Sequence, residues 1–208
     1  MCMTAYLYVL QTLSDWEIGY ITAEMHSRRY FDTSKEPVPL VVVGSAREAV
    51  RTMGGIAINP EERIDAVDFR DGDMLILPGA DTWMERANRK VLDIVPGILE
   101  GGVTVAAICG ATMALANAGV LDTRRHTSND GDYLKAVCPA YSGSGFYVQE
   151  HAVTDGNVIT ATGLAPLEFS YEVFKKLAVM RTATLEAWYQ LNSTREARYY
   201  FALMESLK

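Results

Sequence analysis

Residues 103–119 read Val103-Thr-Val-Ala-Ala-Ile-Cys109-Gly-Ala-Thr-Met-Ala-Leu-Ala-Asn-Ala-Gly119, and this stretch decides the fold. Its first half is a short apolar run, typical of a strand buried on both faces of a parallel sheet. Its second half is rich in small apolar residues and predicts a slim helix over 110–118, which Gly119 is well placed to end. Cys109 therefore lies at a strand-to-helix turn, which raises one side chain above the carboxyl edge of the sheet.

Working outward, short apolar runs alternate with helical spacings along most of the chain. This alternation predicts βαβ units in an α/β fold, with helices on both faces of a mostly parallel sheet and extra helices at the C-terminal end. The other predicted strands are residues 6–10, 40–43, 74–77 and 158–161. The other predicted helices are residues 15–30, 82–99, 165–177, 184–191 and 193–207, the last with Ser193 as its N-cap.

Two segments interrupt the alternation. Residues 48–59 predict a β-hairpin about Gly54-Gly55, and residues 130–147 predict a loop-bearing insertion rich in Gly, Ser, Tyr and Pro. No linker or repeat divides the chain. We therefore expect a single domain over residues 1–208, with a core at about 4–178 and a C-terminal helical extension at about 182–208.

Composition excludes several classes of function. The 208 residues carry a formal net charge of -7, and the 19 Lys and Arg residues cluster only in pairs, so nucleic acid and membrane are poor partners. No apolar run reaches the about 20 residues that a bilayer requires, and the first residues lack a secretory pattern. We expect a cytoplasmic protein that acts on a small molecule.

The three cysteines are Cys2, Cys109 and Cys138, an odd number at wide spacing. This pattern predicts neither a disulfide framework nor a zinc site, and His26 and His151 have no spacing that suggests a metal. We expect no metal and no cofactor. At the strand-to-helix turn, the first N–H groups of the helix favour a Cys109 thiolate. The alternative interpretation is a buried cysteine that acts as a small hydrophobic residue.

Three further motifs accompany this turn in a fixed order. Leu75-Ile-Leu-Pro78-Gly79 precedes it, Ala118-Gly-Val-Leu-Asp122 with Arg124-Arg-His-Thr-Ser-Asn129 follows, and Asp155-Gly-Asn-Val-Ile-Thr-Ala-Thr-Gly163 comes last. Together they resemble the ThiJ/PfpI family, which includes the parkinsonism-associated deglycase and the PfpI-type cysteine peptidases. The resemblance implies a flavodoxin-like three-layer sandwich related to class I glutamine amidotransferase domains, and a homodimer.

The resemblance also implies roles for particular residues. The reactive cysteine of the family corresponds to Cys109, and its acidic partner corresponds to Glu17, with Asp15 as the near alternative. In the family this carboxyl is protonated and donates a hydrogen bond to the thiolate. The plainer interpretation is that Asp15 caps a helix and Glu17 lies on its solvated face. Backbone N–H groups of Gly79 and Gly110 correspond to the oxyanion pocket.

The sequence departs from the family at its histidine. PfpI-type peptidases have a histidine at the position of Gly110, and other members have one at the position of Asn129. Asn129 can orient a substrate but cannot act as a base near neutral pH. The nearest candidate base is His126. The late His-x-Glu motif of the amidotransferases has no counterpart after His151, so a complete glutaminase triad is not expected.

These residues predict a cysteine-dependent hydrolase or lyase that acts on a small carbonyl or amide compound. Cys109 would be the nucleophile and Glu17 the supporting acid. The alternative is a redox or electrophile stress sensor, in which Cys109 is oxidised to the sulfinate and does not turn over substrate. A binding module that keeps the turn for structure, or an amidotransferase-like domain without a complete triad, are the remaining interpretations.

Overall fold

The computed structural model describes residues 3–208, so Cys2 lies outside the described residues. Its centre is a seven-stranded sheet in the order β5-β2-β1-β6-β7-β9-β8. The strands are β1 (Ala5–Val9), β2 (Leu40–Gly44), β5 (Glu62–Arg63), β6 (Met74–Leu77), β7 (Thr104–Ile108), β8 (Ala152–Asp155) and β9 (Val158–Ala161). All neighbouring pairs are parallel except β8 with β9, which are joined by a tight turn.

The middle strands are apolar because both of their faces are covered. Every residue of β6, β7 and β9 is buried. Short continuous apolar runs of this kind are typical of central parallel strands. Parallel pairing also brings the carboxyl ends of β6, β7 and β9 to one edge, with Leu77 opposite Ala107 and Ile108 opposite Ala161. The loops that follow these strands therefore meet beside Cys109.

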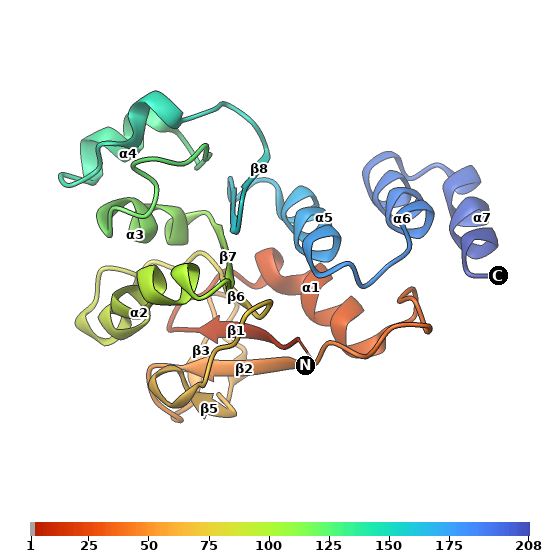
Figure 1. The fold of residues 1–208 in the computed structure, drawn as a ribbon, viewed down its shortest axis with the longest axis horizontal. Helices are drawn as coiled ribbons and strands as arrows, with labels where there is room; N and C mark the ends of the chain where they lie inside the picture. The colour runs from red at the N-terminus through yellow and green to blue at the C-terminus, as the bar shows by residue number, and fades with distance from the viewer. Residues whose placement is uncertain (1–2) are drawn as a thin grey trace.

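Helices cover both faces of the sheet (Figure 1). Helices α1 (Asp15–Ser27) and α5 (Pro166–Leu177) pack together on one face, and α2 (Arg89–Glu100) and α3 (Gly110–Asn117) lie on the other. Short 3₁₀ turns occupy Ile64–Ala66, Arg86–Asn88 and Gly143–Phe146. The predicted α/β fold, a flavodoxin-like three-layer sandwich with a mostly parallel sheet, is confirmed.

Two C-terminal helices, α6 (Thr182–Thr194) and α7 (Ala197–Ser206), lie outside α1 and α5, farthest from the sheet (Figure 1). Trp188 of α6 is buried and meets the rings of Tyr20 and Phe174 edge-on, at centroid distances of 5.5 and 5.3 Å. Its indole N–H donates to Glu24 Oε1 at 3.1 Å. This aromatic contact fastens the extra helices to α1 and α5.

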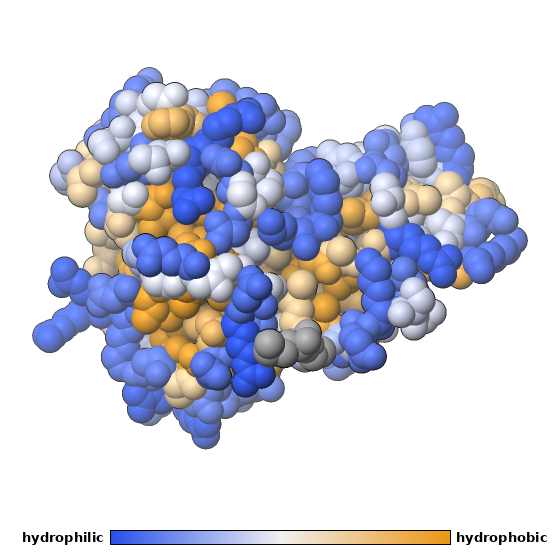
Figure 2. All heavy atoms as spheres, viewed as in Figure 1, coloured by the Kyte–Doolittle hydropathy of each residue, from blue (hydrophilic) through white to orange (hydrophobic). Residues whose placement is uncertain are grey.

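In the view of Figure 2, hydrophilic residues dominate the outline of the molecule, and hydrophobic residues show in the recesses between the helices. No helix within residues 3–208 combines the length and the apolar character that a bilayer crossing requires.

Several predicted boundaries are wrong. Helix α1 ends at Ser27 because Arg28 takes a left-handed backbone with φ 53°. Helix α2 begins at Arg89, seven residues after the predicted start. There the buried Asn88 side chain accepts from Tyr8 and donates to Thr82 O, which holds the preceding segment as a loop.

The secondary structure within residues 130–147 and near residue 193 also differs from the prediction. Ser193 lies in the last turn of α6, and Glu196 is the N-cap of α7. The predicted loop insertion contains a short helix, α4 (Gly131–Val137), which begins where Asp130 accepts from the Tyr133 N–H. The hairpin about Gly54-Gly55 is confirmed as β3 (Val50–Arg51) and β4 (Ala57–Ile58).

Candidate active site

Cys109 occupies the turn between β7 and α3 with a strained backbone. Its φ of 58° and ψ of -123° lie where residues other than glycine are uncommon. Its N–H donates to Ala161 O at 3.0 Å, which ties the turn to the end of β9. The side chain is half-buried, and the N–H of Gly110 faces its sulfur. This geometry is that of a nucleophile elbow.

Glu17 lies against Cys109 from the first turn of α1. The segment before the helix is held to the loop after β6, because Ser14 N–H donates to Gly79 O at 2.9 Å. Glu17 is fully buried, and its Oε2 accepts from the Gly79 N–H at 2.5 Å. Its Oε1 has no nitrogen or oxygen partner within residues 3–208. The interpretation of Glu17 as a solvated helix residue is therefore wrong.

Two glycines allow the carboxyl and the sulfur to approach each other. A Cβ on Gly79 would lie 2.7 Å from Cys109 Cβ and 2.8 Å from both carboxyl oxygens of Glu17. A Cβ on Gly163 would lie 2.7 Å from Cys109 Sγ and 3.3 Å from Glu17 Oε1. The distances of 2.7 and 2.8 Å are shorter than real Cβ contacts, so a side chain at either position would displace the pair. The orphan oxygen Oε1 and the sulfur thus border the same small space.

Burial governs the protonation of this pair. It raises the pKa of Glu17 from 4.5 to about 7, against the opposing effect of the Gly79 N–H. Burial, and after it the Glu17 charge, also raise the pKa of the Cys109 thiol. The Gly110 N–H at the start of α3 lowers this pKa, in the direction predicted from the helix N-terminus, but burial and the Glu17 charge outweigh it. When Glu17 holds a proton its charge vanishes, and its O–H can donate to the sulfur, so the two groups act as one coupled acid.

Asn129 is the third polar group at the sulfur. Its Nδ2 donates to Cys109 Sγ at 3.3 Å. Its Oδ1 accepts from the Gly163 N–H at 2.8 Å and from the Thr162 hydroxyl at 3.3 Å. A backbone N–H can only donate, so the oxygen of the amide must face Gly163 and the NH₂ must face the sulfur. The orientation of Asn129 is thereby fixed, and its NH₂ stabilises negative charge on Cys109.

Buried hydroxyls hold the segment that carries Asn129. Ser128 shares a hydrogen bond of 2.6 Å with Thr112, which in turn donates to Cys109 O. The Thr127 N–H donates to Thr160 Oγ1 at 2.9 Å, and the Thr127 hydroxyl donates to Glu150 O. Satisfied buried bonds of this kind make a rigid support. They connect Asn129 to the start of α3 and to β9.

His126 does not belong to this cluster, which corrects the expectation of a nearby base. It is fully buried, with Nδ1 at 2.7 Å from Arg124 O and Nε2 at 2.7 Å from the Tyr141 hydroxyl. Because a carbonyl can only accept, Nδ1 carries the proton and Nε2 accepts from Tyr141. Burial lowers the pKa of His126, which favours this neutral form. Its role is to fasten the insertion, where its ring also meets Tyr147.

Two other expected site residues, Asp15 and Gly79, are engaged in hydrogen bonds within the protein. Asp15 Oδ2 accepts from the Gly54 N–H at 2.7 Å, so Asp15 holds the β3–β4 hairpin, and Glu17 is the carboxyl beside Cys109. The Gly79 N–H donates to Glu17, and the Gly110 N–H faces the sulfur. The assignment of these two N–H groups to an oxyanion pocket stays a prediction.

The sequence did not single out Gly163 as a site residue. Its N–H orients Asn129, its missing side chain leaves room for the sulfur, and its carbonyl accepts from the half-exposed Trp16 indole at 3.4 Å. Only its position just after β9, at the same sheet edge as Cys109, could have indicated it. Within residues 3–208, His, Cys, Asp and Glu side chains do not gather in groups of three or more that could hold a metal ion.

Comparisons with known proteins find relatives that match most of the chain. The sequence profile described as the DJ-1/PfpI family matches residues 3–176. A Bacillus subtilis protein named as an uncharacterised protease, YoaZ, is 48% identical over 202 residues, which cover 97% of this chain and 96% of that protein. A protein of Pyrococcus abyssi named as a deglycase is 28% identical over 64% of this chain and 78% of its own length.

Solved structures show the same fold. A ThiJ/PfpI family protein from Bacillus anthracis superposes with a TM-score of 0.97 at 47% identity, over 100% of this chain and 99% of that chain. A DJ-1 superfamily protein from Agrobacterium tumefaciens superposes with a TM-score of 0.80 at 29% identity, over 93% of this chain and 98% of that chain.

Proposed function

Because the chain belongs to the DJ-1/PfpI family, we propose that it is a cysteine-dependent hydrolase that acts on a small carbonyl or amide compound. Relatives named as a protease and a deglycase support a hydrolase-type activity. The observation that carries the proposal is the fully buried Glu17, whose unpartnered Oε1 and the Cys109 sulfur border one space beside Gly163.

The mechanism follows from one shared proton. With the proton on Glu17, the Cys109 thiolate attacks the carbonyl carbon, a C–S bond forms, and the carbonyl electron pair moves to oxygen, where the Gly110 N–H stabilises it. The C–N bond then breaks and the departing amine takes the Glu17 proton. Water attacks the resulting thioester, gives a proton back to Glu17 and releases the carboxylic acid and the thiolate.

Asn129 takes the position of the family's histidine in this scheme. It donates to the sulfur but has no proton to exchange near neutral pH. Glu17 must therefore carry every proton transfer, which its pKa of about 7 permits under neutral conditions. A single acid of this kind suits small, activated carbonyl compounds better than peptide bonds held by a Cys-His pair.

Turnover in cysteine variants tests the proposal. A panel of primary amides, dipeptides and 2-oxoaldehydes is incubated with the wild type, Cys109→Ser and Cys138→Ser. Cys138 is the matched control, because its buried thiol contacts Asn117 and Met113 O, outside the Glu17 cluster. We expect turnover of at least one compound that Cys109→Ser abolishes and Cys138→Ser retains. Equal turnover in the wild type and Cys109→Ser would contradict the proposal.

A second function, redox or electrophile sensing, is favoured by one observation, the lack of a histidine base at Cys109. In this case two equivalents of peroxide oxidise the thiolate through the sulfenate to the sulfinate, each being reduced to water, and the Asn129 NH₂ and Gly110 N–H stabilise the negative charge of the sulfinate. The same panel separates the two functions. Rapid oxidation of Cys109 by hydrogen peroxide without turnover of any compound would favour the sensor.

The homodimer and the cytoplasmic location stay proposals. Light scattering on the purified protein measures the first, and fractionation of cells measures the second.

A further inference from the structure

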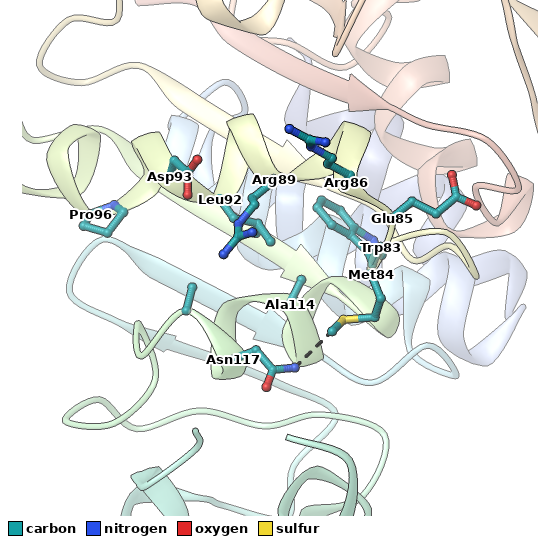
Figure 3. Close-up of a pocket in the computed structure, with 11 residues that line it drawn as sticks. Trp83, Met84, Glu85, Arg86, Arg89, Leu92, Asp93, Pro96, Ala114 and Asn117 are labelled. Carbon is teal, nitrogen blue, oxygen red and sulfur yellow. Dashed lines mark hydrogen bonds between the residues drawn. The ribbon is translucent and has the colours of Figure 1, made fainter. Parts of the chain in front are cut away.

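A hollow that Cys109 does not line lies between α2 and α3 (Figure 3). Its volume is about 690 Å³, within the range of small-molecule sites. Its walls are the exposed face of α2, Ala114 of α3 with Ala118 just after that helix, and Trp83 with Met84 at one end. The proposed reaction uses none of these residues, so the α2–α3 groove needs its own explanation.

Arg89 supplies a positive charge that the protein leaves unpaired. The ion pairs formed within residues 3–208 do not include it. In Figure 3 its guanidinium extends from α2 toward α3, over the groove, while the Glu85 carboxylate extends away at the far end. In a chain with a net charge of -7, an arginine held over an apolar groove attracts an anion.

Asn117 lies across the groove on α3 and has only weak partners. Its Nδ2 contacts Met84 Sδ at 3.9 Å and Cys138 Sγ at 3.4 Å, and sulfur accepts hydrogen bonds poorly. An oxygen of a ligand would satisfy this N–H better. Arg89 and Asn117 together offer one charged donor and one neutral donor from opposite walls, which matches a carboxylate group.

The other residues that line the groove determine which kind of ligand it fits. Leu92, Pro96, Ala114 and Ala118 form an apolar surface beside these donors. Asp93 lies one helical turn after Arg89 and would repel a second negative charge. We propose that the α2–α3 groove binds a small monocarboxylate with an aliphatic chain, its carboxylate between Arg89 and Asn117 and its chain along α2 and α3.

Calorimetric titration of the purified protein with octanoate tests the proposal, with octan-1-ol as the uncharged probe. We expect octanoate to bind at least about tenfold more tightly than octanol, because a charge-assisted bond is lost with the alcohol. Arg89→Gln should weaken octanoate about tenfold or more. Lys90→Gln is the matched control, since Lys90 is the next residue of α2 and pairs with Asp65 outside the groove.

Two further variants locate the ligand. Ala118→Leu places a larger side chain at an exposed groove position and should abolish binding while the protein stays folded by circular dichroism. Cys109→Ser should bind octanoate as the wild type does, because the groove is separate from the active site. The proposal is overturned if octanoate does not bind, if Arg89→Gln and Lys90→Gln bind alike, or if Cys109→Ser loses the binding.

Discussion

Two glutamates of the same helix show how different partners change the character of a buried carboxyl. Glu17 and Glu24 of α1 are seven residues apart, about two turns, and both are buried, at 0% and 1% exposure. Glu24 accepts from the Arg29 guanidinium through both oxygens and from the Trp188 indole. Glu17 has the Gly79 N–H on one oxygen and forms no ion pair within residues 3–208.

Glu17 and Glu24 are equally buried, so the difference between them lies in their hydrogen-bond and charge partners. A buried carboxylate that faces a cation and a second donor joins elements, here α1 to α6. A buried carboxyl without a cation keeps its proton more tightly, and the pKa of Glu17 rises to about 7. Burial of an acidic residue is therefore no sign of function until its partners are known.

The largest expected effect separates the two glutamates by activity. Glu17→Gln keeps an acceptor for the Gly79 N–H but cannot transfer a proton, so turnover should fall about 10³-fold. Alkylation of Cys109 by iodoacetamide at pH 7 should not slow, because the variant also removes the charge that opposes the thiolate. Glu24→Gln should leave both rates unchanged. A parallel fall of turnover and alkylation in Glu17→Gln would contradict the proton-carrier role.

The next effect is on the pH dependence of stability. The pKa of Glu17 in the folded protein, about 7, is above its ordinary value of 4.5, so the folded state binds this proton more tightly. Its contribution is fully present below about pH 4.5 and is lost as the pH rises through 7, by about 3 kcal/mol at most. Urea unfolding from pH 5 to 8 should therefore show the wild type losing stability relative to Glu17→Gln. Identical pH profiles would show that Glu17 ionises normally.

The next prediction concerns the contribution of Glu24 to the free energy of unfolding. Glu24→Gln keeps an acceptor for Trp188 but loses the charge that faces Arg29, and we expect a loss of about 2 kcal/mol in the free energy of unfolding. Urea unfolding at pH 7 measures it, with the exposed pair residue Glu205→Gln as the control. A loss no larger than in Glu205→Gln would mean that the buried pair adds nothing beyond a surface pair.

A smaller effect is expected at the sulfur itself. Asn129→Ala removes the donor at 3.3 Å from Cys109 Sγ and should slow alkylation at pH 7 about tenfold. Asn129→Asp keeps the acceptor for the Gly163 N–H but adds a negative charge, so it should slow alkylation further. If Asn129→Asp reacts as fast as the wild type, Asn129 does not stabilise the thiolate.

The smallest effect concerns the contact between α1 and α6. Trp188→Phe removes the hydrogen bond to Glu24 but keeps an aromatic ring against Tyr20 and Phe174, and should cost about 1 kcal/mol. Combined with Glu24→Gln in a double-mutant cycle, it should show a coupling of about 0.5 kcal/mol or more. Strict additivity would mean that the indole N–H and the carboxylate do not interact.

The local pattern of the sequence was enough for the fold and for the strand-to-helix turn that carries Cys109. Continuous apolar runs predicted the central strands, and the run ending at Cys109 predicted the elbow, because a buried parallel strand followed by a slim helix allows little else. The family resemblance implied that Glu17 accompanies Cys109, with Asp15 as the alternative, and the structure places Glu17 there. The predicted boundaries of helices were wrong where tertiary contacts decided them. Asn88 is an example, because its hydrogen bonds to Tyr8 and Thr82 delay the start of α2.

What only the tertiary structure decided is the protonation and orientation of the site. His126 and Asn129 are three residues apart, and the sequence could not show that the histidine faces Tyr141 while the amide faces Cys109. Nor could it show that Gly163 fixes that amide, or that the Gly79 N–H is engaged by Glu17. Sequence periodicity reports which residues are buried together in an element. Hydrogen-bond partners and local charge depend on segments far apart in the chain, and they decide which buried group keeps its proton.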